Sequence, residues 1–234
     1  MKRRRLGQHY LVDPDVVSKI VASARIAPSE KVLEIGTGKG ALTKELATRG
    51  ASFVGYEVDR ENFVATKEKV KGTRARIHLA DAFEETPEFD VLVSSLPYSE
   101  SATFVEWLSG IKFDRAVVVL QKDFVRKILA PPGDREYRGV SALTQISFDA
   151  RVVGNVNRRS FSPQPKVDSV VVAFAPRRRV DRAEVSNIVR LFSLRRRQVD
   201  SALAELGMRG QGSYGRRRVF SLRPGEVHEI CLPS

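Results

Sequence analysis

The chain has 234 residues, of which 42% are hydrophobic and 29% charged, so it can hold one main domain with a small appendage and is not a disordered chain. Its single cysteine, Cys231, excludes an internal disulfide and a cysteine-cluster metal site. The formal net charge is +12, and residues 151–234 hold 17 lysines and arginines against 7 acidic residues, which indicates a polyanionic partner such as a nucleic acid.

Apolar runs of the length expected for buried strands alternate with segments of helical periodicity in the first half of the chain. Strands are predicted at residues 31–35, 52–58, 76–80, 89–94 and 115–121. Helices are predicted at residues 41–49 and 60–70, each between two of these strands. This alternation is typical of a doubly wound α/β sheet.

The later part of the chain changes character near residue 176. Residues 150–153 and 167–174 are predicted to be further strands, residues 175–179 a linker, and residues 182–194 and 196–206 helices. We therefore expect a main domain over residues 1–175 and a small basic helical domain over residues 176–234. No apolar run follows the basic start of the chain, so we expect a cytoplasmic protein without a membrane partner.

The first candidate site is Glu34-Ile35-Gly36-Thr37-Gly38-Lys39-Gly40, directly after the first predicted strand. Glycines at such a turn let a ligand approach the backbone closely. Taken alone, the segment fits a nicotinamide dinucleotide as well as S-adenosylmethionine. Glu57 and Asp81 come at the ends of the next two strands, where a carboxylate can accept hydrogen bonds from ribose hydroxyls. A surface carboxylate without a ligand is the alternative for each.

The second candidate site is Ser95-Leu96-Pro97-Tyr98, which follows the fourth predicted strand. A turn in which Pro97 fixes φ and Tyr98 packs is the simpler interpretation. With the preceding motifs present, we favour a catalytic one. The exocyclic amine of adenine is a poor nucleophile, and Ser95 Oγ and the Leu96 carbonyl could accept its hydrogen bonds as it becomes tetrahedral. Tyr98 could stack on the extruded base.

With these motifs the chain resembles the ribosomal RNA adenine dimethyltransferases, which modify two adjacent adenines near the 3′ end of small-subunit RNA. Leu6-Gly7-Gln8-His9-Tyr10-Leu11 is similar to the family signature G-Q-[NH]-F-L, and residues 161–171 are similar to F-x-P-x-P-K-V-D-S-x-V. The resemblance covers nearly the whole chain. It implies a Rossmann-like class I S-adenosylmethionine methyltransferase sheet with a small C-terminal helical domain.

The resemblance also implies the roles of individual residues. S-adenosylmethionine would be bound by Gln8, His9, Leu11, Gly36, Gly38, Glu57, Asp81, Ala82 and Ser95. The catalytic residues would be Ser95, Leu96, Pro97, Tyr98 and Phe161. In that arrangement Phe161 clamps the target base against Tyr98, and core packing is the alternative for Phe161. No metal is expected.

Two positions depart from the family pattern. Ser95 stands where the family normally has Asn, which offers a carbonyl acceptor on a longer arm. Serine can accept the same hydrogen bond, but it must direct its own proton elsewhere. Tyr10 replaces the usual Phe and keeps the aromatic face.

Three arginine clusters, at residues 177–179, 195–197 and 216–218, are predicted to bind RNA phosphates, with a solvated basic surface as the alternative. The leading functional hypothesis is methylation of small-subunit ribosomal RNA, either free or in a partly assembled small ribosomal subunit. A large-subunit RNA target is a variant of it. The second hypothesis is an RNA-binding assembly factor of the same fold whose chemistry is weak because of Ser95. The third is a nicotinamide-dependent oxidoreductase.

Overall fold

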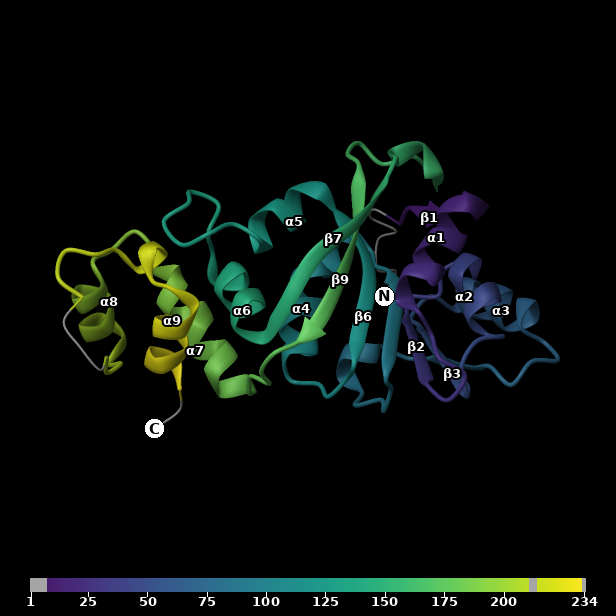
Figure 1. Ribbon diagram of the computed structural model, residues 1–234, viewed down its shortest axis with the longest axis horizontal. Helices are drawn as coiled ribbons and strands as arrows, with labels where there is room; N and C mark the ends of the chain where they lie inside the picture. The colour runs from purple at the N-terminus through teal and green to yellow at the C-terminus, as the bar shows by residue number, and fades with distance from the viewer. Residues whose placement is uncertain (1–7, 211–213, 233–234) are drawn as a thin grey trace. The chain divides into compact units, whose positions relative to one another are not determined.

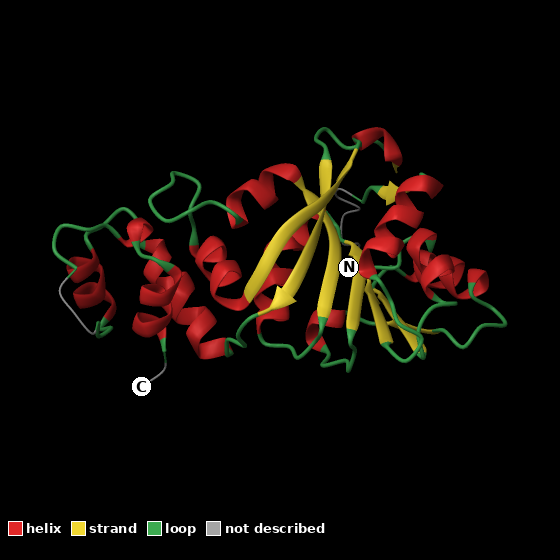
Figure 2. Ribbon diagram, viewed as in Figure 1, coloured by secondary structure: helices red, strands yellow, loops and turns green. Residues whose placement is uncertain are grey.

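The computed structural model describes residues 8–210 and 214–232 and contains a seven-stranded mixed sheet (Figures 1 and 2). Its strands are β2 (Lys31–Ile35), β3 (Ser52–Glu57), β4 (Arg76–Leu79), β5 (Val91–Ser95), β6 (Arg115–Gln121), β7 (Phe148–Val156) and β9 (Ser169–Pro176). The order across the sheet is β4-β3-β2-β5-β6-β9-β7. Pairing is parallel from β4 through β6, and β9 is antiparallel to β6. The predicted doubly wound α/β fold is confirmed.

The strand order reverses between β2 and β5. From β2 the chain builds β3 and β4 on one side and then returns to place β5 on the other side. In doubly wound sheets, ligands bind beyond the carboxyl ends of the strands at such a reversal. Residues 36–40 follow β2 and residues 96–98 follow β5, so the two candidate motifs lie at the expected binding edge.

The chain divides into two compact units. The first comprises the residues up to Ser101 together with Lys112–Lys122 and Arg151–Ala175. The second comprises Ala102–Ile111, Asp123–Ala150 and the residues from Pro176 onward. After residue 175 the chain passes from the first unit to the second for the last time, and the sequence predicted a domain boundary at this point. The second unit also includes two earlier segments. A catalytic role for residues 1–175 and an RNA-binding role for residues 176–234 stay predictions.

The first unit adds three helices and two short strands to the sheet: α1 (Pro14–Ala24), α2 (Ala41–Leu46), α3 (Arg60–Lys69), β1 (Tyr10–Leu11) and β8 (Phe161–Ser162), with 3-10 turns η1 (Ala82–Glu84), η2 (Tyr98–Glu100) and η3 (Arg158–Ser160). Helix α1 begins where it does because the Asp13 side chain accepts hydrogen bonds from the N–H groups of Asp15 and Val16, and Pro14 occupies the first turn. Its buried face packs against β5 and β6.

The second unit is mainly helical. It contains nearly all of α4 (Ser101–Ser109) and α5 (Lys122–Ile128), together with α6 (Gly139–Ser147), α7 (Arg182–Ser193), α8 (Val199–Leu206), η4 (Val219–Ser221) and α9 (Pro224–Cys231). Helices α6, α7 and α9 pack against one another, with Leu191 and Val227 fully buried. The predicted C-terminal helices are therefore present. Among the described residues, no helix has both the length and the apolar character needed to cross a bilayer.

Several predicted boundaries need correction. The predicted strands 31–35 and 115–121 coincide with β2 and β6, whereas β7 extends well beyond residues 150–153. The predicted linker begins too early, because β9 continues to Pro176. The helix predicted from residue 196 begins only at Val199. Residues 195 and 197 are held in a turn in which their carbonyls accept hydrogen bonds from the N–H groups of Phe220 and Val219.

Candidate active site

The loop after β2 presents an open backbone surface. Gly36 and Gly38 have φ angles of 70° and 52°, in the left-handed region that glycine adopts without strain. The N–H groups of Gly36 and Thr37 both donate to the carbonyl of Tyr56 on β3, at 2.8 and 3.2 Å. A Cβ atom at Gly38 would lie only 3.2 Å from Cδ1 of Tyr10. The loop therefore combines a fixed shape with the close backbone approach that a cofactor needs.

Glu57, at the end of β3, organises this loop. Its Oε2 accepts a hydrogen bond from the N–H of Gly38 at 2.7 Å, and its Oε1 accepts from the N–H groups of Val58 and Asp59, both at 2.9 Å. The side chain is buried, and burial raises the pKa of Glu57 although the three N–H donors favour the carboxylate. A carboxylate offers about four acceptor positions. One position therefore stays open, on Oε2.

A cavity at this edge of the sheet brings residues from three chain segments together. It is lined by His9, Tyr10, Leu11, Glu34, Gly36, Thr37, Gly38, Lys39, Ala41, Leu42 and Ser95. Five of the predicted site residues are among them: His9, Leu11, Gly36, Gly38 and Ser95. Within the described part of the chain, the buried Oγ1 of Thr37 has no hydrogen-bond partner. A bound ligand would supply the partner that such a buried hydroxyl normally has.

Glu34 is a cavity residue to which the sequence assigned no role. It is 2% exposed, and its Oε2 accepts a hydrogen bond from Thr43 Oγ1 at 2.6 Å. Burial raises its pKa well above the ordinary value, and the nearby Glu57 adds to that shift. The signal was a single acid inside the apolar strand Lys31–Ile35, which needs a reason because an unpaired charge is costly to bury.

The other predicted cofactor residues lie outside the cavity lining. Gln8 accepts a hydrogen bond from the Tyr10 hydroxyl at 2.6 Å, and Glu57 reaches the cavity through Gly38. Asp81 accepts from the N–H of Phe83 at 3.0 Å, and the neighbouring Ala82 is buried. Leu6 and Gly7 of the N-terminal signature, and the basic residues before them, lie outside the described residues.

The segment after β5 lies directly beside the glycine loop. Ser95 ends β5, Leu96 is buried, and a Cβ atom on Gly36 would lie 3.8 Å from Cδ of Pro97. Tyr98 begins η2, and its hydroxyl lies 2.8 Å from the Oγ of Ser169. The structure therefore brings the two candidate motifs to one site.

The N-terminal signature and the Phe161 motif are joined to each other next to Tyr98. Strands β1 and β8 pair so that Leu11 lies opposite Phe161. Nδ1 of His9 donates to the carbonyl of Pro163 at 2.6 Å, and the His9 ring lies 5.5 Å from the Tyr98 ring, centroid to centroid. Phe161 itself is 4% exposed and belongs to the hydrophobic core. Its packing role is therefore visible, and its contact with a target base stays a prediction.

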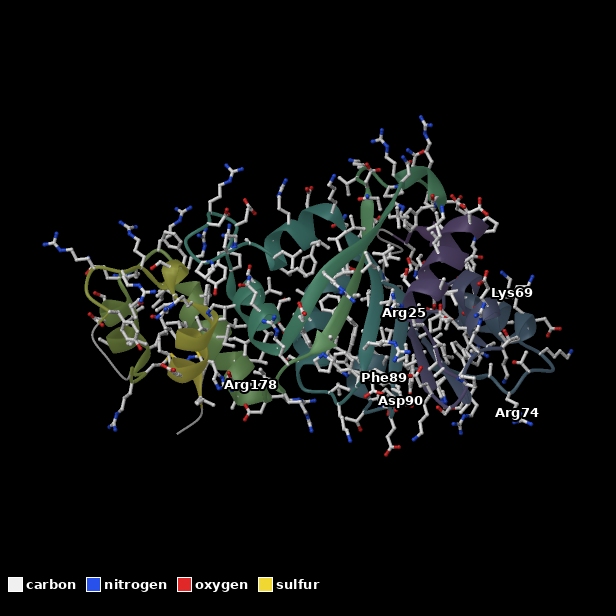
Figure 3. The ribbon with its side chains drawn as sticks, in the orientation of Figure 1. Arg25, Lys69, Arg74, Phe89, Asp90 and Arg178 are labelled. Atoms are coloured by element: carbon white, nitrogen blue, oxygen red, sulfur yellow. The ribbon has the colours of Figure 1, made fainter. Side chains whose placement is uncertain are left out.

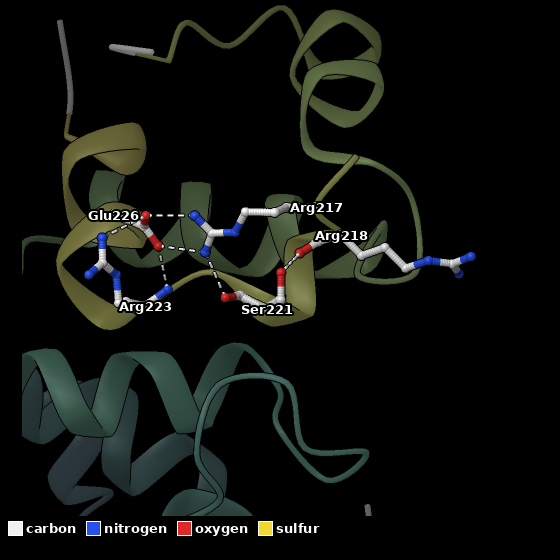
Figure 4. A network of polar contacts seen from close by, with 5 residues as sticks. All are labelled: Arg217, Arg218, Ser221, Arg223 and Glu226. Carbon is white, nitrogen blue, oxygen red and sulfur yellow. Dashed lines mark hydrogen bonds and ion pairs between the residues drawn. The ribbon is translucent and has the colours of Figure 1, made fainter. Parts of the chain in front are cut away.

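One member of the third arginine cluster is used inside the second unit. The guanidinium of Arg217 forms hydrogen bonds of 2.8 and 2.9 Å to the two carboxylate oxygens of Glu226 and a third to the carbonyl of Ser221 (Figure 4). Arg223 also contacts Glu226, both through its N–H and through its guanidinium. This network links the chain before η4 to the start of α9, so Arg217 is a structural residue.

The other two clusters include exposed and half-buried members. Arg178 is exposed (Figure 3), and Arg195 lies near Arg138 and Arg196. Desolvation lowers the pKa of Arg195, and the two neighbouring cations lower it further. Arg138 therefore adds positive charge near Arg195 from a distant part of the sequence, and Glu136 partly opposes it.

Comparison with known proteins agrees with this geometry. The family model described as "Ribosomal RNA adenine dimethylase" matches residues 1–221. The probable ribosomal RNA small subunit methyltransferase A of Pyrococcus abyssi is 36% identical over 97% of this chain and 89% of that protein. Its counterpart in Thermotoga maritima is 35% identical over 73% of this chain and 62% of that protein.

Solved structures show the same relationship. A dimethyladenosine transferase from Plasmodium falciparum superposes with a TM-score of 0.79 at 25% identity, covering 95% of this chain and 96% of that one. The 23S rRNA methyltransferase ErmE superposes with a TM-score of 0.66 at 26% identity, covering 95% and 98%. These matches exclude the nicotinamide-dependent oxidoreductase. The chain is an S-adenosylmethionine-dependent methyltransferase and belongs to the ribosomal RNA adenine dimethylase family.

Proposed function

We propose that this enzyme methylates the exocyclic amines of two adjacent adenines near the 3′ end of small-subunit ribosomal RNA. The substrate would be RNA in a partly assembled small subunit in the cytoplasm. The names and the nearly full-length similarity of the small-subunit relatives support the RNA class. The observation that carries the chemistry is that the glycine loop and Ser95 line one cavity, since a methyl donor and its acceptor must meet there.

The chain offers a fitting site for S-adenosylmethionine. Gly36 and Gly38 would cradle its amino-acid end, next to the unpartnered Thr37 hydroxyl. Glu57 would accept one ribose hydroxyl at the open position of Oε2. Further contacts are proposed for Gln8, His9, Leu11, Asp81, Ala82 and Ser95. When bound, the cofactor supplies an electrophilic methyl group on a positively charged sulfur.

The residues after β5 would prepare the target amine. Ser95 Oγ and the Leu96 carbonyl accept its hydrogen bonds, which stabilises the nitrogen as it becomes tetrahedral. Pro97 fixes the turn that aims these acceptors, and Tyr98 stacks on the base and holds the amine in line. Phe161 would supply the opposite wall. The positioning of the reactants is then the main source of rate enhancement.

The exposed arginines of the second unit would bind the RNA backbone. Arg178, Arg195 and Arg196 are exposed or half-buried and lie on the parts of the chain with the greatest excess of positive charge. Each phosphate that they neutralise steepens the salt dependence of binding by roughly 0.7 to 0.9 log units per log unit of salt. We expect RNA binding to weaken steeply with salt.

The test is a methylation assay with S-adenosylmethionine and unmodified small ribosomal subunits, followed by digestion and mass spectrometry of the adenosines. Dimethyladenosine at two adjacent positions is the expected product. Free small-subunit RNA and large-subunit RNA serve as parallel substrates. Product on large-subunit RNA alone would overturn the proposed target, and no product on any RNA would overturn the activity.

The Ser95 departure is tested in the same assay. Ser95→Ala should lower the rate about a hundredfold, since losing one well-placed acceptor costs roughly 3 kcal/mol in the transition state. Ser95→Asn should retain activity because the longer amide also presents an oxygen acceptor. An unchanged rate in Ser95→Ala would remove Ser95 from the catalytic set. Activity only in Ser95→Asn would support the assembly-factor alternative.

A further inference from the structure

We infer that Arg158, Arg159 and Lys166 form a phosphate-binding rim beside the target-base site and hold the RNA backbone next to the adenosine that is methylated. The inference rests on the proposed function and specifies how that site would recognise its substrate. Together these three residues make up the basic rim. They lie outside the three arginine clusters of the sequence and belong to the first unit.

The charge of this segment is unbalanced. Residues 157–168 contain the three cations of the rim, and Asp168 is their only acid. Asp168 is already engaged, since its Oδ1 accepts a hydrogen bond from the N–H of Arg158 at 3.0 Å. Arg158, Arg159 and Lys166 are all exposed. Over the ranges that the structure describes, no hydrogen bond or ion pair engages the guanidinium of Arg159 or the ammonium of Lys166. Their charges are therefore free to meet an anion.

The segment is anchored at several points, so the cations are presented by a fixed loop. Nη1 of Arg158 donates to the carbonyl of Lys166 at 3.3 Å, which brings the two ends of the rim together. Ser160 Oγ donates to Oδ2 of Asp13 at 2.9 Å, and β1 pairs with β8 just beyond it. The carbonyl of Asp168 accepts from the N–H of Lys122 at 3.1 Å. Such fixation lowers the ordering cost when a ligand binds.

The same segment approaches Tyr98 at two points. Asp168 directly precedes Ser169, whose Oγ lies 2.8 Å from the Tyr98 hydroxyl. In the middle of the segment, the carbonyl of Pro163 accepts a hydrogen bond from His9, whose ring lies 5.5 Å from the Tyr98 ring. A base stacked on Tyr98 would therefore have its own backbone near the rim.

A phosphodiester backbone fits this surface by its chemistry. It presents a row of single negative charges, which arginine can bind with two parallel hydrogen bonds and lysine as a point charge. Proteins that bind single-stranded nucleic acid commonly combine an aromatic stacking residue with basic residues along the backbone. Tyr98 and the basic rim provide this combination. The rim would set substrate affinity and leave the chemical step to Ser95 and Leu96.

The experiment compares two double variants. Arg159→Gln/Lys166→Gln removes two rim charges, and Arg158 is kept because it also holds the loop. Arg49→Gln/Arg74→Gln is the matched control. Both of its arginines are exposed, belong to the same unit and lie just before the amino ends of β3 and β4, away from the carboxyl ends where the site lies (Figure 3 labels Arg74). The probes are a short fluorescent single-stranded RNA with two adjacent adenines and unmodified small subunits.

In the rim variant, the slope of log Kd against log salt should become shallower by about 1.4, which is roughly 0.7 for each lost phosphate contact on a single strand. The KM for small subunits should rise more than about tenfold at 0.1 M salt, while kcat and the Kd for S-adenosylmethionine stay unchanged. The control should keep the wild-type slope and KM.

An unchanged slope and KM in the rim variant would overturn the inference and identify these residues as a solvated surface. Equal losses in rim and control variants would also overturn it, because the effect would then come from net charge alone. The RNA titration does not depend on turnover. If the wild-type enzyme methylated nothing, the proposed function would fail while the titration still decided whether the rim binds RNA.

Discussion

The phenol oxygen of Tyr98 lies 2.8 Å from the Oγ of Ser169, although 71 residues separate them in the chain. Ser169 is buried at the start of β9, so this contact fixes the direction of the Tyr98 ring. Burial raises the pKa of Tyr98 above its ordinary value, and the Ser169 hydrogen bond only partly opposes that shift. Tyr98 is therefore a neutral phenol at physiological pH. It can stack its ring on the target adenine, but it does not accept a proton as a general base.

Replacing Tyr98 should separate catalysis from cofactor binding. Tyr98→Ala should lower the single-turnover methylation rate about 10- to 100-fold, since stacking of a base on an aromatic side chain contributes roughly 1–3 kcal/mol. Tyr98→Phe keeps the ring and should lose only a few-fold. Calorimetry should give a wild-type Kd for S-adenosylmethionine in both variants. Equal losses of rate and cofactor affinity would contradict a role on the base side.

The role of Phe161 must be tested with a substitution that destabilises the fold less than alanine does. Its side chain is buried in the core, where truncation of Phe to Ala typically costs about 3–5 kcal/mol of stability. Phe161→Leu keeps most of the volume and removes the ring face. If Phe161 walls the base site, Phe161→Leu should fold with a melting temperature close to wild type and still lower the methylation rate about tenfold. A wild-type rate would leave Phe161 with packing as its only role.

Glu57 should control cofactor affinity through the loop that it organises. Glu57→Gln places an amide among three N–H donors, so the amide nitrogen must oppose at least one of them. An unsatisfied buried group costs roughly 1–3 kcal/mol, which corresponds to about a 5- to 150-fold higher Kd for S-adenosylmethionine. Isothermal titration calorimetry measures this directly. An unchanged Kd would remove Glu57 from the cofactor site.

The departure of Tyr10 from the family's phenylalanine has a structural consequence. Its hydroxyl donates to Gln8 at 2.6 Å and accepts from Nδ2 of Asn62 on α3 at 3.3 Å, and the ammonium of Lys39 lies 4.8 Å from its ring centroid. The hydroxyl thus ties the N-terminal strand over the glycine loop to α3. The sequence predicted only that the aromatic face would be kept.

Tyr10→Phe should remove the two hydrogen bonds of the hydroxyl and keep the aromatic ring over the glycine loop. We expect S-adenosylmethionine to dissociate about two- to tenfold faster, because a hydrogen bond of this kind contributes roughly 0.5–1.5 kcal/mol net. Stopped-flow displacement measures the dissociation rate. Gln8→Ala made in the Tyr10→Phe background should add little, since the bond between them is already lost. Additive effects of the two changes would mean that they act independently.

The sequence predicted those features that depend on residues close together in the chain. Strands β2 and β6 were predicted to the residue because each is a short, mainly apolar segment, and the two ligand motifs could be placed because they follow such segments. Helix α1 was missed, although Asp13 and Pro14 form a recognisable helix start.

Other features depend on contacts between distant segments and have no local signal. Strands β1 and β8 are two residues long, too short for any periodicity, yet they join the N-terminal signature to the Phe161 motif. The inclusion of residues 102–111 and 123–150 in the second unit is equally non-local. The same holds for the arginine clusters, where contacts with Glu226 and the carbonyl of Ser221 engage Arg217.

The Arg217–Glu226 pair makes the stability of the second unit dependent on pH. The Arg217 hydrogen bonds hold the pKa of Glu226 well below its ordinary value, and Arg223 adds to the shift. Since the folded-state pKa is depressed, the contribution is fully present above the unfolded-state pKa of about 4.3 and is lost as the pH falls below it. Glu226→Gln should therefore lower the free energy of unfolding at pH 7 by about 1–2 kcal/mol, a figure reduced for the partial exposure of Arg217.

Denaturant titrations of this variant between pH 7 and pH 3 provide the measurement, with Glu229→Gln as the control. Glu229 is exposed on the same helix and carries the same charge. The wild-type protein and the control should both lose stability as the pH falls from 5 to 3, and Glu226→Gln should lose less, because its residue 226 no longer titrates. If the free energy of unfolding fell equally between pH 5 and pH 3 in all three proteins, the ion pair would contribute nothing to folding.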